Sequence, residues 1–197
     1  MSGGFIVVLA ILAFAAVTIF KGVRIVPQGY KWIVQRLGKY HTTLNPGLNF
    51  VIPYVDEVAY KVTTKDIVLD IPSQEVITRD NAVLLMNAVA YINITTPVNA
   101  VYGIENYTWA IQNLVQTSLR SIVGEMDLDD ALSSRDHIKA KLKAAISDDI
   151  SDWGITLKTV EIQDIQPSST MQAAMEAQAA AERQRRATVT KADGEKQ

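Results

Sequence analysis

The chain has 197 residues, a formal net charge of -2 at pH 7 and no cysteine. The lack of cysteine excludes a disulfide framework and thiolate chemistry. Its basic residues are dispersed among acidic ones, without a basic patch and interleaved aromatic side chains, which argues against binding to nucleic acid. Once an apolar N-terminal segment is set aside, roughly 170 residues remain, enough for one domain or two small ones.

The N-terminal segment is apolar and uncharged over residues 5–20. As a helix this run reaches only about 24 Å, somewhat less than a hydrocarbon core of roughly 30 Å. We expect the helix to continue to Val26, with Lys21 and Arg24 reaching toward the headgroups. Residues 1–26 are therefore predicted to be a transmembrane anchor, whose membrane-facing residues are Phe5, Ile6, Val7, Val8, Leu9, Ile11, Leu12, Phe14, Val17, Ile19 and Phe20.

Two alternatives to such an anchor remain open. The tripeptide Ala13-Phe14-Ala15 resembles the cleavage site of a secretory signal, although no basic residue precedes the apolar run. A hairpin that dips into one leaflet is the second alternative, although it usually has a Pro or Gly-rich break in mid-run. For an anchor, the positive-inside rule places the bulk of the chain in the cytoplasm. The flank before the segment has no basic residue, whereas the flank after it has Lys21, Arg24, Lys31, Arg36 and Lys39.

Short apolar runs alternate with turn signals over residues 27–57, which predicts a small β-rich subdomain near the anchor. The pair Pro46-Gly47 suits a type II turn, in which the glycine has a positive φ. An apolar stretch follows this turn and is close to the anchor in sequence. We predict that it contacts the membrane, with a place in the core as the alternative, and its residues are Leu48, Phe50, Val51, Ile52 and Tyr54.

Residues 58–167 are predicted to form a second subdomain of mixed α and β structure. Strands are expected at 58–62, 67–71 and 83–95, with Pro72 ending the second. The third is apolar at nearly every position, as in a central strand that is covered on both faces.

Two helices and a last strand are predicted next. The first helix spans about residues 108–123 and is stopped by Gly124. The second begins near Ser133, which has the capping-box spacing to Asp136, and ends at a cap on Gly154. The last strand covers residues 155–165.

The composition changes after Ser168 to Ala, Glu, Gln and Arg, without aromatic residues. This predicts a long exposed helix, which we expect to continue into a coiled coil beyond Gln197. Two interpretations of this helix remain. It is either a solvated terminal helix or a helix that associates between subunits, since an Ala-lined face allows close approach of a second helix. The residues expected at such a contact are Met171, Ala174, Met175, Ala181 and Val189.

No catalytic, phosphate-binding or dinucleotide-binding motif occurs in the sequence, so no catalytic residue and no cofactor are predicted. His41 and His137 fit surface positions better than a role as base or ligand. The acidic group at 125–130 lacks the glycine and the distal Glu of a calcium loop, so no metal site is predicted. A membrane-tethered hydrolase would have to use scattered residues without any motif, namely Ser73, Ser118 or Ser133 with His137.

Several runs of the sequence resemble the SPFH domain that stomatins, prohibitins and flotillins share. The first half carries Val26-Pro-Gln-Gly29, Val34-x-Arg-x-Gly-Lys39 and Pro46-Gly-Leu-x-Phe-x-x-Pro53. The second half is similar to stomatins in Asp70-Ile-Pro-Ser-Gln-Glu75 and Trp153-Gly-Ile155. The resemblance covers essentially the whole chain, and within the family it is strongest to the bacterial stomatin-like and paraslipin branch.

This resemblance implies an α+β fold with an N-terminal transmembrane helix, an SPFH (band 7) domain of short strands and helices, and a long C-terminal helix. It further implies a non-enzymatic homo-oligomer in the bacterial inner membrane, where rings or cages delimit a patch of lipid. Such assemblies hold partners like the membrane AAA protease FtsH or NfeD-type proteins. The helical region ends sooner here than in the family pattern. A monomeric or dimeric membrane-tethered adaptor is the alternative function.

Overall fold

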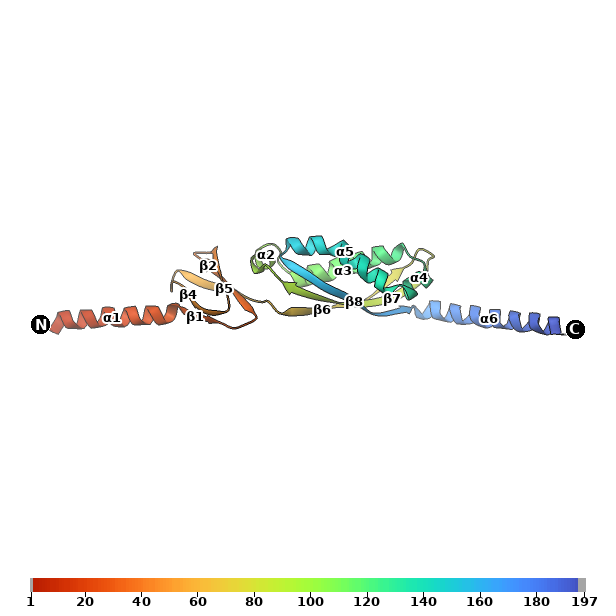
Figure 1. The fold of residues 1–197 in the computed structure, drawn as a ribbon, viewed down its shortest axis with the longest axis horizontal. Helices are drawn as coiled ribbons and strands as arrows, with labels where there is room; N and C mark the ends of the chain where they lie inside the picture. Colours follow the sequence, from red (N-terminus) through yellow and green to blue (C-terminus); the bar gives the residue numbers. More distant parts are fainter. Residues whose placement is uncertain (1, 195–197) are drawn as a thin grey trace. The chain divides into compact units, whose positions relative to one another are not determined.

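A computed structural model describes the backbone of residues 2–194, and all side chains except those of residues 1–3, 5, 6, 10, 178 and 189–197. Figure 1 shows the elements along the chain and labels all of them except β3. The helices are α1 (Ser2–Gly22), α2 (Pro97–Tyr102), α3 (Tyr107–Gly124), α4 (Leu128–Ser133), α5 (Arg135–Asp152) and α6 (Ser169–Gly194). The strands are β1 (Val23–Val26), β2 (Tyr30–Arg36), β3 (Lys39–Leu44), β4 (Gly47–Phe50), β5 (Asp56–Thr63), β6 (Asp66–Ile77), β7 (Val83–Ile94) and β8 (Ile155–Pro167).

The chain divides into two compact units that are discontinuous in sequence. One comprises Met1–Ile67, Tyr91–Tyr107 and Ser147–Lys158, and the other comprises Val68–Ala90, Thr108–Ile146 and Thr159–Gln197.

The N-terminal part of the first unit is built from short antiparallel strands. Strands β3, β2 and β5 form one sheet in that order, and β1 pairs with β4 in another. Residues 27–57 contain short strands, as predicted, and the strand predicted at 58–62 pairs with β2 in the same sheet. Gly47 has a φ of 113°, the positive sign predicted for the turn glycine. Apolar side chains from both sheets meet in a small core formed by Val26, Val34, Leu44 and Val51, with Trp32 and Val58 packed against it.

The N-terminal helix ends earlier than predicted. Helix α1 stops at Gly22, and the residues expected to continue it form β1, opposite β4. The β-branched side chains of β1 favour an extended backbone over a helix. The carbonyl oxygen of Gly22 accepts a hydrogen bond from the Val51 N–H at 2.8 Å, which ties the end of α1 to the chain after β4. A side chain at Gly22 would collide with this contact, since a Cβ there would lie 2.7 Å from the Val51 carbonyl oxygen.

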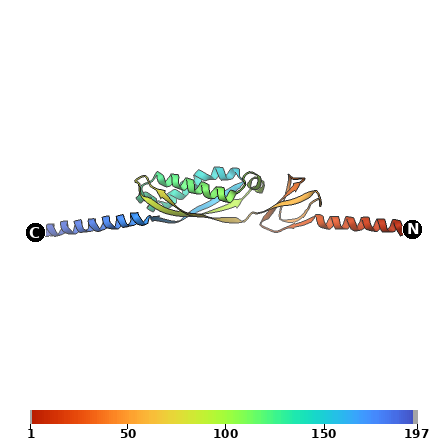
Figure 2. The same cartoon turned by 180° about the vertical axis from the view of Figure 1, so that it is seen from behind.

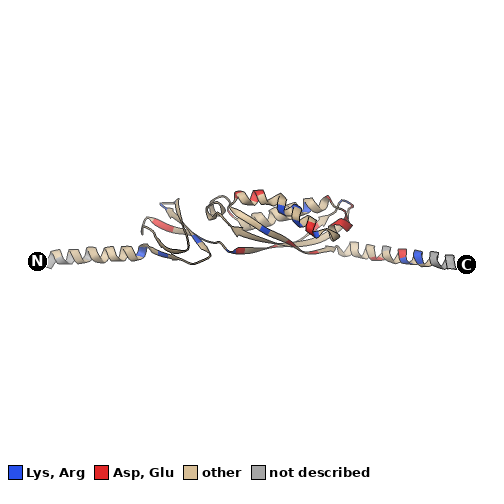
Figure 3. Cartoon of the chain, in the orientation of Figure 1, with Lys and Arg blue, Asp and Glu red and all other residues tan. Residues whose placement is uncertain are grey.

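Within the described part of the chain, no helix combines the length and the apolar character that a membrane crossing requires. This corrects the transmembrane anchor predicted at 1–26: the residues expected to complete the crossing lie in a strand that pairs with β4. Helix α1 carries no charged residue before Lys21, as Figure 3 shows for the described positions.

The second unit is organised around a three-stranded sheet with the order β6-β7-β8. Helices α3 and α5 lie along one face of this sheet in both views (Figures 1 and 2). Strand β7 is central, as predicted, but one of its faces is only partly covered, because Leu85 and Tyr91 each remain 37% exposed while Val89 between them is buried. The core between sheet and helices contains Leu69, Ile71, Val76, Leu84, Met86, Ile111, Val115, Leu119, Ile138, Leu142, Ile146 and Val160.

Strand β6 continues through Pro72, which was expected to end it. A proline costs a sheet one ladder hydrogen bond only if its nitrogen faces a neighbouring strand. Because β6 is an edge strand in this sheet, the missing N–H can face away from β7. The prediction of a break at Pro72 is therefore wrong.

A tight turn that contains the polar residues 79–81 joins β6 to β7. The Thr78 hydroxyl donates to the Ala82 carbonyl oxygen at 3.1 Å and accepts from the Ala82 N–H at 3.0 Å. Asn81 has a φ of 65°, which asparagine tolerates better than most residues. The Asp80 carboxylate accepts the Leu128 N–H at 3.2 Å, and so holds the start of α4 to this turn.

The predicted capping box at the start of the second long helix is wrong. Helix α5 begins at Arg135, and the Ser133 hydroxyl donates to the Asp129 carbonyl oxygen at 2.6 Å, within the short helix α4 that was not predicted. The predicted cap at the other end is confirmed, because Gly154 has a φ of 67°. The last strand and the long C-terminal helix are also present, as β8 and α6.

Candidate functional site

The ribbon of β1 and β4 exposes an apolar face. Ile25 lies opposite Leu48 and Val23 lies opposite Phe50, and directly opposed residues of an antiparallel pair project on the same side. Ile25, Leu48 and Phe50 are 71%, 63% and 71% exposed. Val26, which alternates with them, points into the core. One side of the ribbon thus completes the core, and the other offers large apolar side chains to the surroundings.

The loop after β4 adds two more exposed apolar residues. Ile52 and Tyr54 are 54% and 69% exposed, and Phe20, in the last turn of α1, is 81% exposed. The Lys21 ammonium lies 5.5 Å from the centre of the Tyr54 ring, a cation–π distance that brings the loop to the end of α1. We call this group the α1-end surface; its members are Phe20, Ile25, Leu48, Phe50, Ile52 and Tyr54.

Four of the five residues predicted to contact a membrane belong to the α1-end surface. The exception is Val51, which is only 9% exposed and lies in the small core, so the alternative of a core position holds for it. Ile25 was missed, because residues 23–26 were assigned to the helix. The alternation of Val23 and Ile25 with Arg24 and Val26 is a period-two pattern that could have revealed this strand.

The described apolar side chains of helix α1 are not buried in a core. Of the predicted membrane-facing residues, Phe5 and Ile6 lie outside the described side chains. The others are exposed: Val7, Val8, Leu9, Ile11, Leu12, Phe14, Val17, Ile19 and Phe20. The hydroxyl of Thr18 donates to the Phe14 carbonyl oxygen at 2.8 Å, so this polar group is satisfied within the helix. A helix that is apolar on all sides is typical of burial in lipid or protein.

An ion pair braces the loop that carries Ile52 and Tyr54. Arg36 donates from Nε to Asp56 Oδ1 at 2.7 Å, and the Ile52 N–H donates to Asp56 Oδ2 at 2.9 Å. The Asp56 side chain is only 3% exposed. The Arg36 hydrogen bond and, to a smaller extent, the Ile52 N–H lower the pKa of Asp56 from 3.8 to about 2. Asp56 therefore stays ionised and keeps the loop in place.

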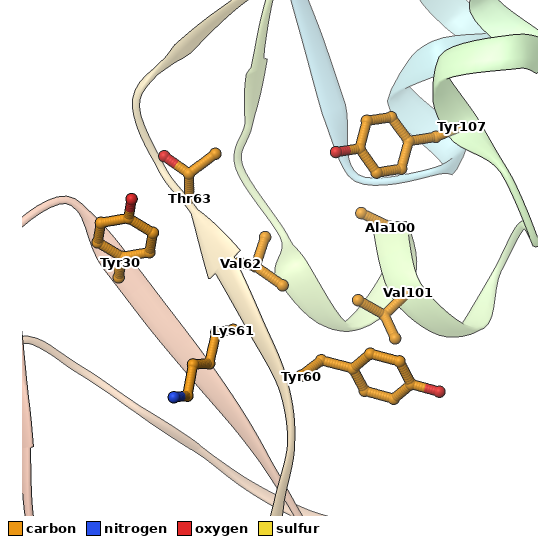
Figure 4. A pocket seen from close by; sticks show the side chains of 8 residues that line it. All are labelled: Tyr30, Tyr60, Lys61, Val62, Thr63, Ala100, Val101 and Tyr107. Carbon is orange, nitrogen blue, oxygen red and sulfur yellow. The ribbon is translucent and has the colours of Figure 1, made fainter.

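A hollow of about 370 Å³ in the same unit lies between β5 and α2, and three tyrosines line it: Tyr30, Tyr60 and Tyr107. Figure 4 shows Tyr60 and Lys61 on opposite sides of β5. Beside this hollow, the Tyr102 ring meets those of Tyr40 and Tyr60 edge-on, with centroids 6.3 and 5.9 Å apart, and its hydroxyl accepts a hydrogen bond from Gln35. This arrangement packs aromatic edges and brings together no nucleophile with a base.

The predicted oligomerisation residues lie on α6. Met175 is 37% exposed, Ala174 and Ala181 are exposed, and the Met171 side chain is half-buried. The side chain of Val189 lies outside the described part. A groove of about 610 Å³ runs beside the first turns of α6 and includes Met175, Ala179 and Pro167. Most of the described side chains of α6 are therefore exposed.

The acidic residues that follow α3 have structural roles. Arg79 forms an ion pair with Asp127, which stands at the N-cap position of α4, and Asp129 and Asp130 lie in its first turn. No group of three or more potential metal-ligating side chains occurs among the described residues. Of the serines considered for a hydrolase, Ser133 is bonded to the Asp129 carbonyl oxygen and not to a base.

An apolar N-terminal helix, a small β unit, an α+β unit and an exposed Ala-rich helix define a chain of the SPFH class. The SPFH domain / Band 7 family matches residues 24–196. The chain belongs to this family, as its sequence motifs predicted. Its α+β fold with short strands, helices and a C-terminal helix agrees with that membership.

Individual relatives are similar over nearly the whole chain. A stomatin homolog of Pyrococcus abyssi is 40% identical over 193 residues, which are 98% of this chain and 72% of that protein. A stomatin homolog of Pyrococcus horikoshii has the same identity and coverage. An uncharacterized protein of Mycobacterium tuberculosis is 36% identical over 191 residues, which are 97% of this chain but only 50% of the relative, so the chain spans half of that protein's length. Both stomatin homologs are archaeal, so the placement in the bacterial stomatin-like and paraslipin branch stays a prediction.

Proposed function

We propose that this chain is a membrane-attached, non-enzymatic scaffold unit of stomatin type, whose copies assemble and organise a patch of membrane around a resident membrane protein. The observation that carries the proposal is the exposure of the described apolar side chains of α1 and of the α1-end surface. The membrane association of SPFH proteins supports it.

The magnitude of the apolar exposure favours a stable attachment. Transfer of one large aliphatic or aromatic side chain out of water is worth about 1.5–3 kcal/mol. The exposed side chains of α1 and the α1-end surface together supply on the order of 10 kcal/mol or more, even after the cost of immobilising the protein at the bilayer. Contact of α1 with the apolar layer, without a crossing of the membrane, would cover these side chains, and the α1-end surface would then lie at the lipid boundary.

Helix α6 supports the assembly part of the proposal. Its described residues carry a row of alanines and two methionines, with the i,i+4 pair Glu182–Arg186 on its surface. Alanine rows let two helices approach closely, while methionines fit imperfect surfaces. A second copy of α6 is the occupant we propose for this helix. The protein held by the assembly, an AAA protease of FtsH type or an NfeD-type protein, is part of the proposal.

Particle imaging of the full chain extracted in a mild detergent tests the assembly. We expect rings or cages in wild-type protein. The variant Ala174→Glu with Ala181→Glu should dissolve them, because it buries carboxylates between helices. The matched control Ala173→Glu with Ala180→Glu adds the same charge one residue earlier and should retain them. Monomers or dimers in all three proteins would overturn the scaffold and favour a simple adaptor.

Extraction of membranes with alkaline carbonate tests the attachment. We expect the full chain to stay with the bilayer, because its apolar side chains do not depend on charge for binding. Release of the protein at high pH would overturn attachment through α1.

A further inference from the structure

A groove opens between the end of α1 and the loop after β4. Its volume is about 540 Å³, and its walls include Lys21, Arg24, Pro53, Tyr54 and Asp56. It therefore adjoins the α1-end surface directly, since Phe20 and Tyr54 belong to both. The groove lies where an apolar helix ends and polar residues begin.

The carboxylate in this groove is already neutralised. Both oxygens of Asp56 accept hydrogen bonds from Arg36, at 2.7 and 3.0 Å, and one of them also accepts the Ile52 N–H. An ionised carboxylate held in this way by a guanidinium contributes little net charge to its neighbourhood. The positive charges of Lys21 and Arg24 are therefore not compensated by Asp56.

Lys21 and Arg24 are free to act on a ligand. Within the described part of the chain neither forms an ion pair, and Lys21 stacks only against the Tyr54 ring. Glu57 lines an adjoining groove with Arg24 and Trp32. Even if Glu57 balances one cation, the region keeps one positive charge in excess.

We propose that this groove binds the phosphate headgroup of an anionic phospholipid, with Lys21 and Arg24 as its ligands. The inference rests on the proposed membrane attachment and names the lipid that the attachment selects. A lipid fits both halves of the site, because its charged headgroup meets the cations while its acyl chains cover Phe20 and Tyr54. A soluble phosphate compound would leave these apolar side chains exposed.

Bilayers that contain a quencher on one lipid at a time test the site. The full chain is reconstituted into equal amounts of phosphatidylcholine and phosphatidylglycerol, with one or the other lipid brominated. Trp32 reports the neighbouring lipid, because it shares a groove wall with Arg24. Each basic residue at an anionic surface favours binding roughly fivefold, so we expect a preference for phosphatidylglycerol of roughly 25-fold that weakens as salt is added.

The variant Lys21→Gln with Arg24→Gln should lose this preference. The matched control Lys31→Gln with Lys39→Gln removes the same charge from β2 and β3, outside the groove, and should keep it. An equal loss in both variants would overturn the site in favour of diffuse attraction. Equal quenching of wild type by both lipids would overturn the anionic-lipid site alone, whereas quenching by neither lipid would overturn membrane contact of this surface. Unchanged urea midpoints of the variants would show that they fold.

Discussion

Arg36 and Asp56 form a two-bond ion pair that joins the end of β2 to the start of β5, with N···O distances of 2.7 and 3.0 Å. The two residues are also register partners in the sheet. Asp56 extends the connection, because it accepts the Ile52 N–H of the loop that carries Tyr54. The α1-end surface and the groove beside it therefore depend on one buried carboxylate.

The pH dependence of unfolding should report this carboxylate. Folding lowers the pKa of Asp56 from 3.8 to about 2, chiefly through the Arg36 hydrogen bond. A lowered pKa stabilises the fold above pH 4, and the stabilisation is lost as the pH falls from about 4 to about 2. Asp56→Asn should therefore reduce the free energy of unfolding by about 2 kcal/mol at neutral pH, with the gap to wild type closing in acid.

Urea unfolding followed by tryptophan fluorescence, at intervals between pH 7 and pH 2, measures this gap. Other carboxylates with lowered pKa, such as Asp66 and Glu161, titrate in both proteins, so the difference isolates Asp56. A gap that stays constant down to pH 2 would show that the pair does not stabilise the fold in this way.

The sequence was sufficient to predict elements with strong local signals. The helix predicted over about residues 108–123 is present as α3, and Ile111, Val115 and Leu119 are buried on one of its faces. The αL cap at Gly154 was likewise predicted from its place after an amphipathic stretch. Such signals depend on neighbours within a few residues, which a sequence displays directly.

The errors arose where pairing between distant segments decides the structure. Val23–Val26 continues an apolar run and was assigned to the helix, but β4 captures it as a strand. The strand that became β5 was assigned to the second subdomain because nothing local shows that it pairs with β2. Burial within the candidate site also depends on pairing between distant segments. Val51 could be separated from Phe50 and Ile52 only once the ribbon and its core face were known.

Lipid contact of the β1–β4 ribbon should be visible with brominated phospholipids. Leu48→Thr with Phe50→Thr replaces two exposed apolar side chains by smaller polar ones that still suit a strand. We expect weaker quenching of Trp32 fluorescence, because the ribbon loses about 2–4 kcal/mol of transfer free energy and moves away from the acyl chains. The control Val68→Thr with Ile77→Thr changes equally exposed positions of β6 and should leave the quenching unchanged. A similar effect of both pairs would contradict a specific contact of the ribbon.

The turn between β2 and β3 contains an unfavourable residue. Leu37 has a φ of 49° and is 85% exposed, so neither its backbone nor its side chain is favoured in water. Leu37→Asn should raise the free energy of unfolding by about 0.5–1 kcal/mol, since asparagine tolerates the left-handed region and suits the first position of a two-residue hairpin turn. Chemical denaturation in detergent measures the change. A loss of stability would mean that the leucine side chain has a packing role.

Two glycines with positive φ differ in the space around them. Substitutions at these two positions therefore separate the cost of backbone strain from the cost of a steric collision. Gly38 has a φ of 82°, and a Cβ added there would meet no other segment of the chain within 4 Å, whereas a Cβ on Gly154 would lie 2.5 Å from the Thr96 carbonyl oxygen. Gly38→Ala should cost only the backbone strain of about 1 kcal/mol. Gly154→Ala should cost at least about 2 kcal/mol more, because the contact is with backbone, and Thr95 and Thr96 both donate to the Gly154 carbonyl oxygen at 3.0 and 2.9 Å. Urea midpoints of the two variants give the comparison. Equal losses of stability in the two variants would show that the chain after β7 moves away from the added Cβ at little cost. The cost of a side chain at Gly154 would then come from its positive φ alone.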